Sequence, residues 1–128
     1  MSRSYRDLIA WQKALALVTT IYETSGEFPK HELYGLTSQI RRAAVSVVSN
    51  IAEGQGRNSA REFVLFLSHA NGSLVEVETQ VFVAESLRYV TAEKKSALLE
   101  KTEEVGRLIA GLSLSLREKS QGAAGGKD

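Results

Sequence analysis

Three residues of one segment carry side chains that could bind a metal ion. Glu62, His69 and Glu76 recur every seven residues, so on a helix they lie on one side. Helical bundles hold di-iron sites with paired Glu-x-x-His motifs, but Phe66 stands three residues before His69, and no glutamate precedes either histidine by three. We therefore interpret these residues as a polar strip between helices, and we expect no metal and no cofactor.

Motifs for nucleophilic catalysis and for phosphate-binding loops are also missing. The sequence has no Gly-x-Ser-x-Gly elbow, and Gly54-Gln55-Gly56 is not followed by the Lys-Ser/Thr pair of such a loop. The chain contains no cysteine, which excludes thiol catalysis, disulfide bonds and cysteine-bound zinc. We predict no catalytic residues and no enzymatic activity.

The remaining candidates are four arginines near one predicted helical hairpin, with Arg41 and Arg42 on its first helix and Arg57 and Arg61 beside its turn. A guanidinium group presents a planar fork of donors that suits phosphate. The net charge of +1 is small, and the sequence has no helix-turn-helix spacing and no RNA-recognition signature. Two interpretations stay open. The arginines contact RNA or DNA, or Arg41 and Arg42 pair with acidic residues of the next helix or of a neighbouring subunit.

The elements that carry these residues are predicted from apolar spacing. One ladder alternates steps of four and three residues, which is typical of a helix with one buried stripe: Phe63, Leu67, Ala70, Leu74, Val77, Val81 and Ala84. A second stripe comes earlier: Leu36, Ile40, Ala44, Val47 and Ile51. Together with similar stripes elsewhere, they predict helices at about residues 5–25, 30–53, 59–89 and 92–118. Short links between them predict an all-α, up-down-up-down antiparallel four-helix bundle.

The same pattern sets the expected domain limits. Residues 1–118 form one domain, and residues 119–128 lack apolar periodicity, so we expect a disordered tail there. The amino terminus has no secretory signal, and no window approaches a transmembrane span free of charge. We expect a cytoplasmic protein without membrane contact.

The third helix has apolar residues beside its main ladder, and these could face another subunit: Val64, Leu65, Val75 and Phe82. One apolar stripe needs one partner layer, so a second stripe favours a core contact on one side and a subunit contact on the other. The alternative is a helix buried centrally in its own bundle. We favour the oligomer, in which the same few arginines would repeat and their fields would add.

Several runs of this sequence carry a resemblance to a known family: residues 8–14 (LIAWQKA), 28–29 (FP), 34–46 (YGLTSQIRRAAVS), 49–54 (SNIAEG), 62–63 (EF) and 72–80 (GSLVEVETQ). They resemble the four-helix-bundle family named for proteins encoded in intervening sequences of bacterial 23S ribosomal RNA. Some of its members are labelled S23 ribosomal protein. The resemblance implies an up-down bundle assembled as a homopentamer, with no enzymatic activity.

A more distant resemblance is to the accessory protein of diversity-generating retroelements. That protein is a pentameric barrel that binds nucleic acid and a reverse transcriptase. The resemblance implies that Arg41, Arg42, Arg57 and Arg61 meet nucleic acid, and that a reverse transcriptase or another nucleoprotein is a partner.

These observations lead to two functional hypotheses. The first is a non-enzymatic, homo-oligomeric bundle that binds RNA or DNA through a basic surface or scaffolds a nucleoprotein. The second is a protein-binding oligomeric adaptor without nucleic-acid contact.

Overall fold

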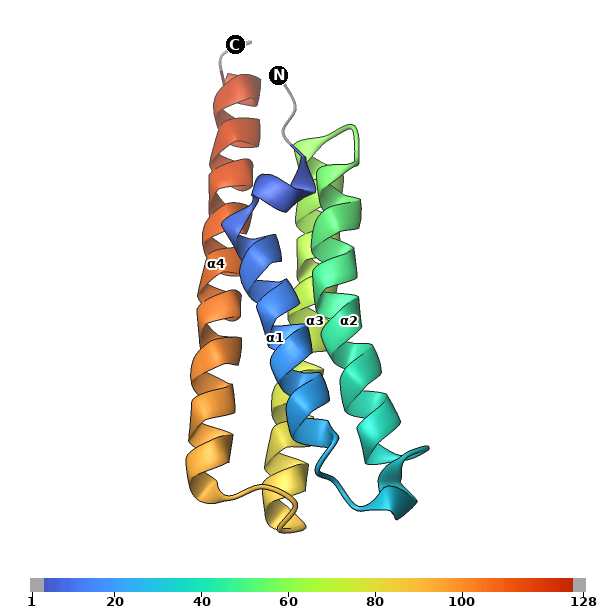
Figure 1. The fold of residues 1–128 in the computed structure, drawn as a ribbon. Coiled ribbons are helices and arrows are strands. Elements are labelled where there is room, and N and C mark those ends of the chain that lie inside the picture. The colour runs from blue at the N-terminus through green and yellow to red at the C-terminus, as the bar shows by residue number, and fades with distance from the viewer. Residues whose placement is uncertain (1–3, 126–128) are drawn as a thin grey trace.

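Long antiparallel helices make up almost all of the molecule. The computed structural model describes residues 4–125, and in them every regular element is helical. The main helices are α1 (Ile9–Ser25), α2 (Leu36–Gln55), α3 (Ala60–Ser86) and α4 (Ala92–Gly125), with single 3₁₀ turns η1 (Tyr5–Asp7) and η2 (Lys30–Glu32). In Figure 1 successive helices run in opposite directions, and the α2–α3 turn lies at the end where α1 begins. The predicted all-α four-helix bundle is confirmed.

The core is built from the two predicted apolar stripes. All seven residues of the α3 ladder and all five of the α2 stripe are buried, none with more than 9% of its surface exposed. Residues of α1 and α4 complete the core, among them Leu17, Ile21, Leu98 and Val105. Spacing along each helix was therefore sufficient to identify the buried side of α2 and α3.

The tightest contact between helices is at the α2–α3 turn, where Gly54 lies against α3. A Cβ atom on Gly54 would be 2.7 Å from Phe63 Cδ1 and 2.9 Å from Phe66 Cβ. The start of α3 is fixed by Ser59, whose Oγ accepts a hydrogen bond from the Glu62 backbone N–H at 3.1 Å, as a capping box requires. Gly54 is thus needed for close packing, and α2 continues past it to Gln55.

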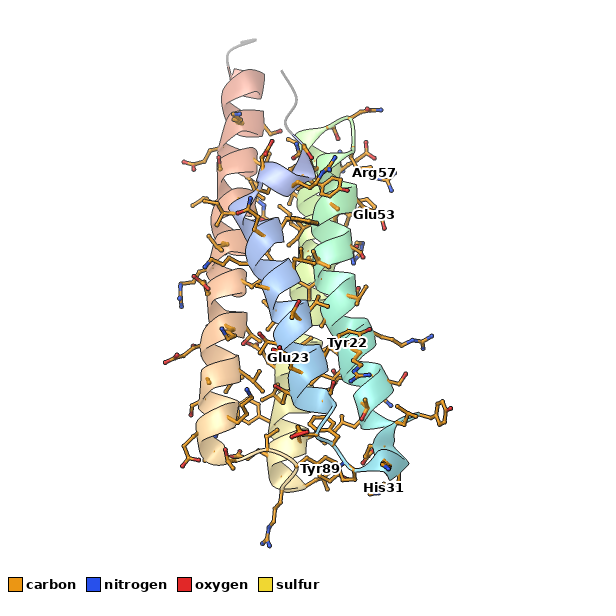
Figure 2. The ribbon with its side chains drawn as sticks, in the orientation of Figure 1. Tyr22, Glu23, His31, Glu53, Arg57 and Tyr89 are labelled. Carbon is orange, nitrogen blue, oxygen red and sulfur yellow. The ribbon has the colours of Figure 1, made fainter. Side chains whose placement is uncertain are left out.

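The start of α2 differs from the predicted boundary because a side chain caps it. The helix begins at Leu36, whereas the sequence predicted a start at about residue 30. Glu32 lies in η2, and its Oε1 accepts a hydrogen bond from the Leu36 N–H at 3.0 Å. Its Oε2 accepts one from the Tyr89 hydroxyl at 2.7 Å, which joins the α1–α2 link to the α3–α4 link. Figure 2 shows Tyr89 beside His31 at this end.

These two bonds also set the acidity of both groups. The hydrogen bond from the Leu36 N–H, assisted by the Tyr89 hydroxyl, holds the pKa of Glu32 below its usual value. The carboxylate in turn raises the pKa of Tyr89. Both shifts favour an ionised Glu32 and a protonated Tyr89 in the folded protein.

Both ends of the chain also differ from the predicted boundaries. Before α1, Leu8 is extended and separates η1 from the helix, so the α-helix starts at Ile9 and not at residue 5. At the other end α4 continues to Gly125, so residues 119–125 of the expected disordered tail are helical, and residues 126–128 lie outside the described part. Extending an existing helix costs less than starting one, and Lys119, Gln121, Ala123 and Ala124 are good helix formers. Across residues 4–125 no helix is long and apolar enough to cross a membrane.

Candidate nucleic-acid interface

The four arginines that are close in sequence do not form one patch. Arg41 and Arg42 lie near the start of α2, while Arg57 and Arg61 flank its far end. At 1.5 Å per helical residue, Arg41 and Arg57 are about 24 Å apart along the bundle. Figure 2 shows Arg57 at the α2–α3 end and Tyr22, which stacks with Arg41, well towards the opposite end. The four arginines therefore fall into two separate pairs, one towards each end of α2.

Arg41 is bound to the carboxyl end of α1. Its Nε donates a hydrogen bond to Ser25 Oγ at 2.8 Å, and its Nη2 donates one to the Tyr22 carbonyl oxygen at 3.2 Å. The guanidinium carbon also lies 4.5 Å from the centre of the Tyr22 ring. A cation at this position satisfies terminal carbonyls and complements the helix dipole. Arg41 is thus a structural residue, paired with α1 and not with an acid of α3.

Arg57 is partly committed as well. Its Nη2 is 3.5 Å from Glu53 Oε2, and its guanidinium lies 4.4 Å from the centre of the Phe66 ring. The ion pair is exposed and weak, but the charge of Glu53 offsets the charge of Arg57. Arg57 is therefore a secondary contributor to any anion site.

Arg42 is free by comparison. It is exposed, and within residues 4–120 it has no ion pair or hydrogen-bond partner. It lies at a shallow depression of about 300 Å³, whose other lining residues are Tyr22, Leu33, Tyr34, Thr37, Ser38 and Arg41. We call this the Tyr34 depression. No carboxylate lines it.

Arg61 is also unpaired among the described side chains, and a second arginine joins it. Arg117 of α4 lines the same depression of about 260 Å³, together with Ala60, Val64, Leu116 and Ser120. An adjoining depression of about 270 Å³ shares Val64 and Arg117 and adds Leu67, Ser68, Asn71, Ile109, Ala110, Ser113 and Leu114. We call the two together the α3–α4 groove. It has an apolar and hydroxyl-rich lining with a cation from each helix.

Arg117 was not among the predicted site residues. It is far from Arg61 in sequence, and only the antiparallel pairing of α3 with α4 brings the end of one beside the start of the other. The usable signal was topological: a short link between two long helices places their distant ends together.

The predicted subunit-contact residues lie mostly in solvent. Leu65, Val75 and Phe82 are 54%, 51% and 51% exposed. Val64 is half-buried because it lies against α4 in the groove. Large apolar side chains are exposed on the side of α1 and α2 as well, including Leu15 and Val45. The bundle therefore carries unpartnered apolar surface on more than one side.

The polar strip of α3 does not have the geometry of a metal site. In the part of the chain that the structure describes, no three or more His, Asp or Glu side chains gather closely enough to hold a metal ion. His69 instead packs against Phe66, with ring centres 5.9 Å apart.

Comparison with known proteins gives the family. Residues 6–111 match the family model described as 23S rRNA-intervening sequence protein. The chain belongs to that family. Among curated proteins no match is found. One similar solved structure is a protein of unknown function from the S23 ribosomal protein family of Bacteroides thetaiotaomicron, with a TM-score of 0.76 and 20% identity over 82% of this chain and 98% of that chain. At that identity the likeness shows the fold alone.

The extent of the family match separates the two candidate surfaces. The 23S rRNA-intervening sequence protein model covers the Tyr34 depression and Arg61, but it stops at residue 111. On the α4 side of the groove, Ile109 and Ala110 lie within the matched residues, whereas Arg117 and Ser120 lie beyond them. The family match therefore covers the α3 side of the groove and only part of its α4 side.

Proposed function

We propose that this member of the 23S rRNA-intervening sequence protein family is a non-enzymatic homo-oligomer, expected to be a pentamer, that binds the phosphate backbone of RNA or DNA. The observation that carries the proposal is the pair of guanidinium groups of Arg61 and Arg117, which lie in one groove and have no partner among the described side chains. Two such groups from different helices can hold successive phosphates.

The charge around the groove supports this choice over other basic surfaces. Among the described side chains no carboxylate lines the α3–α4 groove, whereas hydroxyl and amide groups do, and such groups commonly contact phosphate and sugar. By contrast, Arg107, also on α4, lines a surface depression with Glu100, Glu103 and Glu104. Acids compensate Arg107 and not Arg117, so the groove is the better anion site.

Oligomerisation supplies the rest of the affinity. Two arginines per chain are a weak electrostatic footprint, but a ring repeats them around its axis and strengthens the field. A closed ring requires a heterologous contact, in which two different surfaces of each subunit meet. Exposed apolar residues of α3, such as Val75 and Phe82, and of α1 and α2, such as Leu15 and Val45, supply two such surfaces.

The binding experiment is fluorescence anisotropy with labelled RNA and DNA at 50–200 mM salt. If the oligomer makes six to ten phosphate contacts, its affinity should fall roughly 10³- to 10⁵-fold as salt rises from 50 to 200 mM. The double variant Arg61→Glu/Arg117→Glu should weaken binding to all sequences alike, because phosphate contacts carry no base information. Lys101→Glu/Arg107→Glu is the matched control, with the same change of charge. Equal effects of the two double variants would refute the groove assignment.

The assembly experiment is light scattering coupled to size exclusion. The mass should be several times 14.0 kDa, with five copies expected. Phe82→Lys should lower it, because a charge would be buried in an apolar contact, whereas Ser96→Lys on exposed α4 should not. A monomer for the unmodified protein at micromolar concentration would sink the oligomer proposal.

One observation favours the second candidate, a protein-binding adaptor. Val64 and Leu116 give the groove an apolar lining between its two arginines, which also suits an acidic amphipathic helix. Absence of nucleic-acid binding at 50 mM salt, with an intact oligomer, would make the adaptor the better account.

A further inference from the structure

Tyr34 is the most exposed large hydrophobic side chain in the described part of the protein. It is 93% exposed, and its neighbour Leu33 is 50% exposed. An aromatic ring surrounded by water loses the stabilisation that burial would give it. Its position therefore needs an explanation other than packing within the subunit.

The backbone around Tyr34 is held firmly. On one side, the Leu33 N–H donates to the Lys30 carbonyl oxygen at 3.1 Å. On the other, the Leu36 N–H donates to the Glu32 carboxylate at 3.0 Å, and Leu36 itself is buried. The ring is thus presented from an anchored turn, so little ordering of the backbone is needed when it binds a ligand.

The residues beside Tyr34 complete a polar and cationic edge. Ser38 and Arg42 lie one helical turn apart on α2, and both line the depression together with Tyr34 from the turn before the helix. They present a ring, a hydroxyl group and an unpaired guanidinium. Tyr22 in the same depression already has Arg41 stacked on it, so Tyr34 is the ring with open faces.

We propose that the Tyr34 depression binds single-stranded nucleic acid, with the Tyr34 ring stacked on an unpaired base and Arg42 holding an adjacent phosphate. This rests on the proposed function and adds a preference for single strands. Aromatic platforms beside basic residues are the usual means of holding single strands, because every base has a face that can stack. Paired bases inside a duplex are not available in this way.

A protein contact is the competing explanation, because exposed tyrosine and arginine are also typical of protein hot spots. The lining of the depression favours the nucleotide. It contains two guanidinium groups and no carboxylate, which matches a strand that carries a phosphate at every step.

The test uses oligomeric full-length protein and three substitutions at Tyr34. Tyr34→Phe keeps the ring, Tyr34→Leu keeps apolar area without a ring, and Tyr34→Ala removes both. The probes are a single strand containing 2-aminopurine and a duplex of equal length, each followed by anisotropy. Loss of one stacked base should weaken single-strand binding by roughly 5- to 150-fold. We expect that loss for leucine and alanine, and a change of less than about twofold for phenylalanine.

Duplex binding supplies the internal control. It should be unchanged by all three substitutions, because the groove arginines make its contacts. The 2-aminopurine fluorescence should change on binding to unmodified protein and to Tyr34→Phe, and not with Tyr34→Leu. Arg42→Met should lower affinity for single strands and reduce the salt dependence by about one phosphate contact.

The possible failures are distinguishable. If unmodified protein binds neither probe at 50 mM salt, the proposed function and this inference both fall. If it binds, and Arg61→Glu/Arg117→Glu weakens binding while Tyr34→Ala does not, only this inference is overturned. If Tyr34→Ala lowers the mass measured by light scattering, the depression is a subunit contact and the inference is overturned as well.

Discussion

Arg41 and Arg42 are adjacent on α2, and comparing their variants separates a role in stability from a role in nucleic-acid binding. Arg41→Met should destabilise the fold, and Arg42→Met should not, although the two residues are neighbours with the same charge. Methionine keeps an unbranched apolar stem and a good helix propensity. The comparison therefore isolates what each guanidinium does.

The magnitude follows from the contacts of Arg41. A hydrogen bond from a charged donor, such as that to Ser25 Oγ, contributes roughly 1.5–3 kcal/mol. A cation over an exposed ring contributes about 0.5–1 kcal/mol, and a cation at a helix carboxyl end about 0.3–1 kcal/mol. These overlap at one partly exposed side chain, so the sum overstates the effect. We expect a loss of about 2 kcal/mol for Arg41→Met and less than about 0.5 kcal/mol for Arg42→Met.

The assay is urea unfolding followed by circular dichroism at one fixed chain concentration, because oligomers gain stability with concentration. For a slope of about 1–3 kcal/mol per molar urea, the Arg41→Met midpoint should fall by roughly 1 M. Anisotropy on the same two proteins should show the reverse order, with weaker nucleic-acid binding for Arg42→Met only. Equal midpoints for the two variants would show that the contacts of Arg41 with α1 contribute nothing measurable.

Two further predictions concern glycines and pH. Gly54→Ala should destabilise the fold by more than about 2 kcal/mol, because its methyl group would overlap α3. Gly72→Ala should stabilise it by about 1 kcal/mol, because a Cβ at Gly72 would meet nothing within 4 Å and alanine favours a helix. Thermal unfolding that gives the opposite order of stability would contradict the packing at the α2–α3 turn. The lowered pKa of Glu32 should add stability that is fully present above the unfolded-state pKa and is lost as pH falls through the folded value. Unfolding free energies from pH 6 to 3 should therefore converge for unmodified protein and Glu32→Gln, and a constant difference would contradict this.

The sequence predicted well the features that depend on residues within one helix. The burial of Leu67, Ala70 and Val77 follows from spacing within α3, because a helix converts steps of three and four residues into one side. The cap at Ser59 is equally local. Such features require no knowledge of the neighbouring helices.

The predictions that failed depend on contacts between distant segments. The start of α2 is set by Glu32, whose carboxylate is held in turn by the Tyr89 hydroxyl of the α3–α4 link. Arg41 and Arg57 lie apart although both belong to the same hairpin, because each helical residue between them adds 1.5 Å along the axis. Arg117 was missed for the opposite reason, since the fold brings it to Arg61 across a long stretch of sequence.

The location of the two free arginines has a consequence for any ring that these subunits form. Arg42 lies in the first half of α2 and Arg61 at the start of α3, and Figure 1 shows the start of α3 at the opposite end of the bundle from the start of α2. In a ring whose axis runs along the bundles, symmetry gathers all copies of Arg42 and Tyr34 near one rim and all copies of Arg61 and Arg117 near the other. A strand that follows either rim meets the same contact once per subunit, so weak single contacts combine through their high effective concentration.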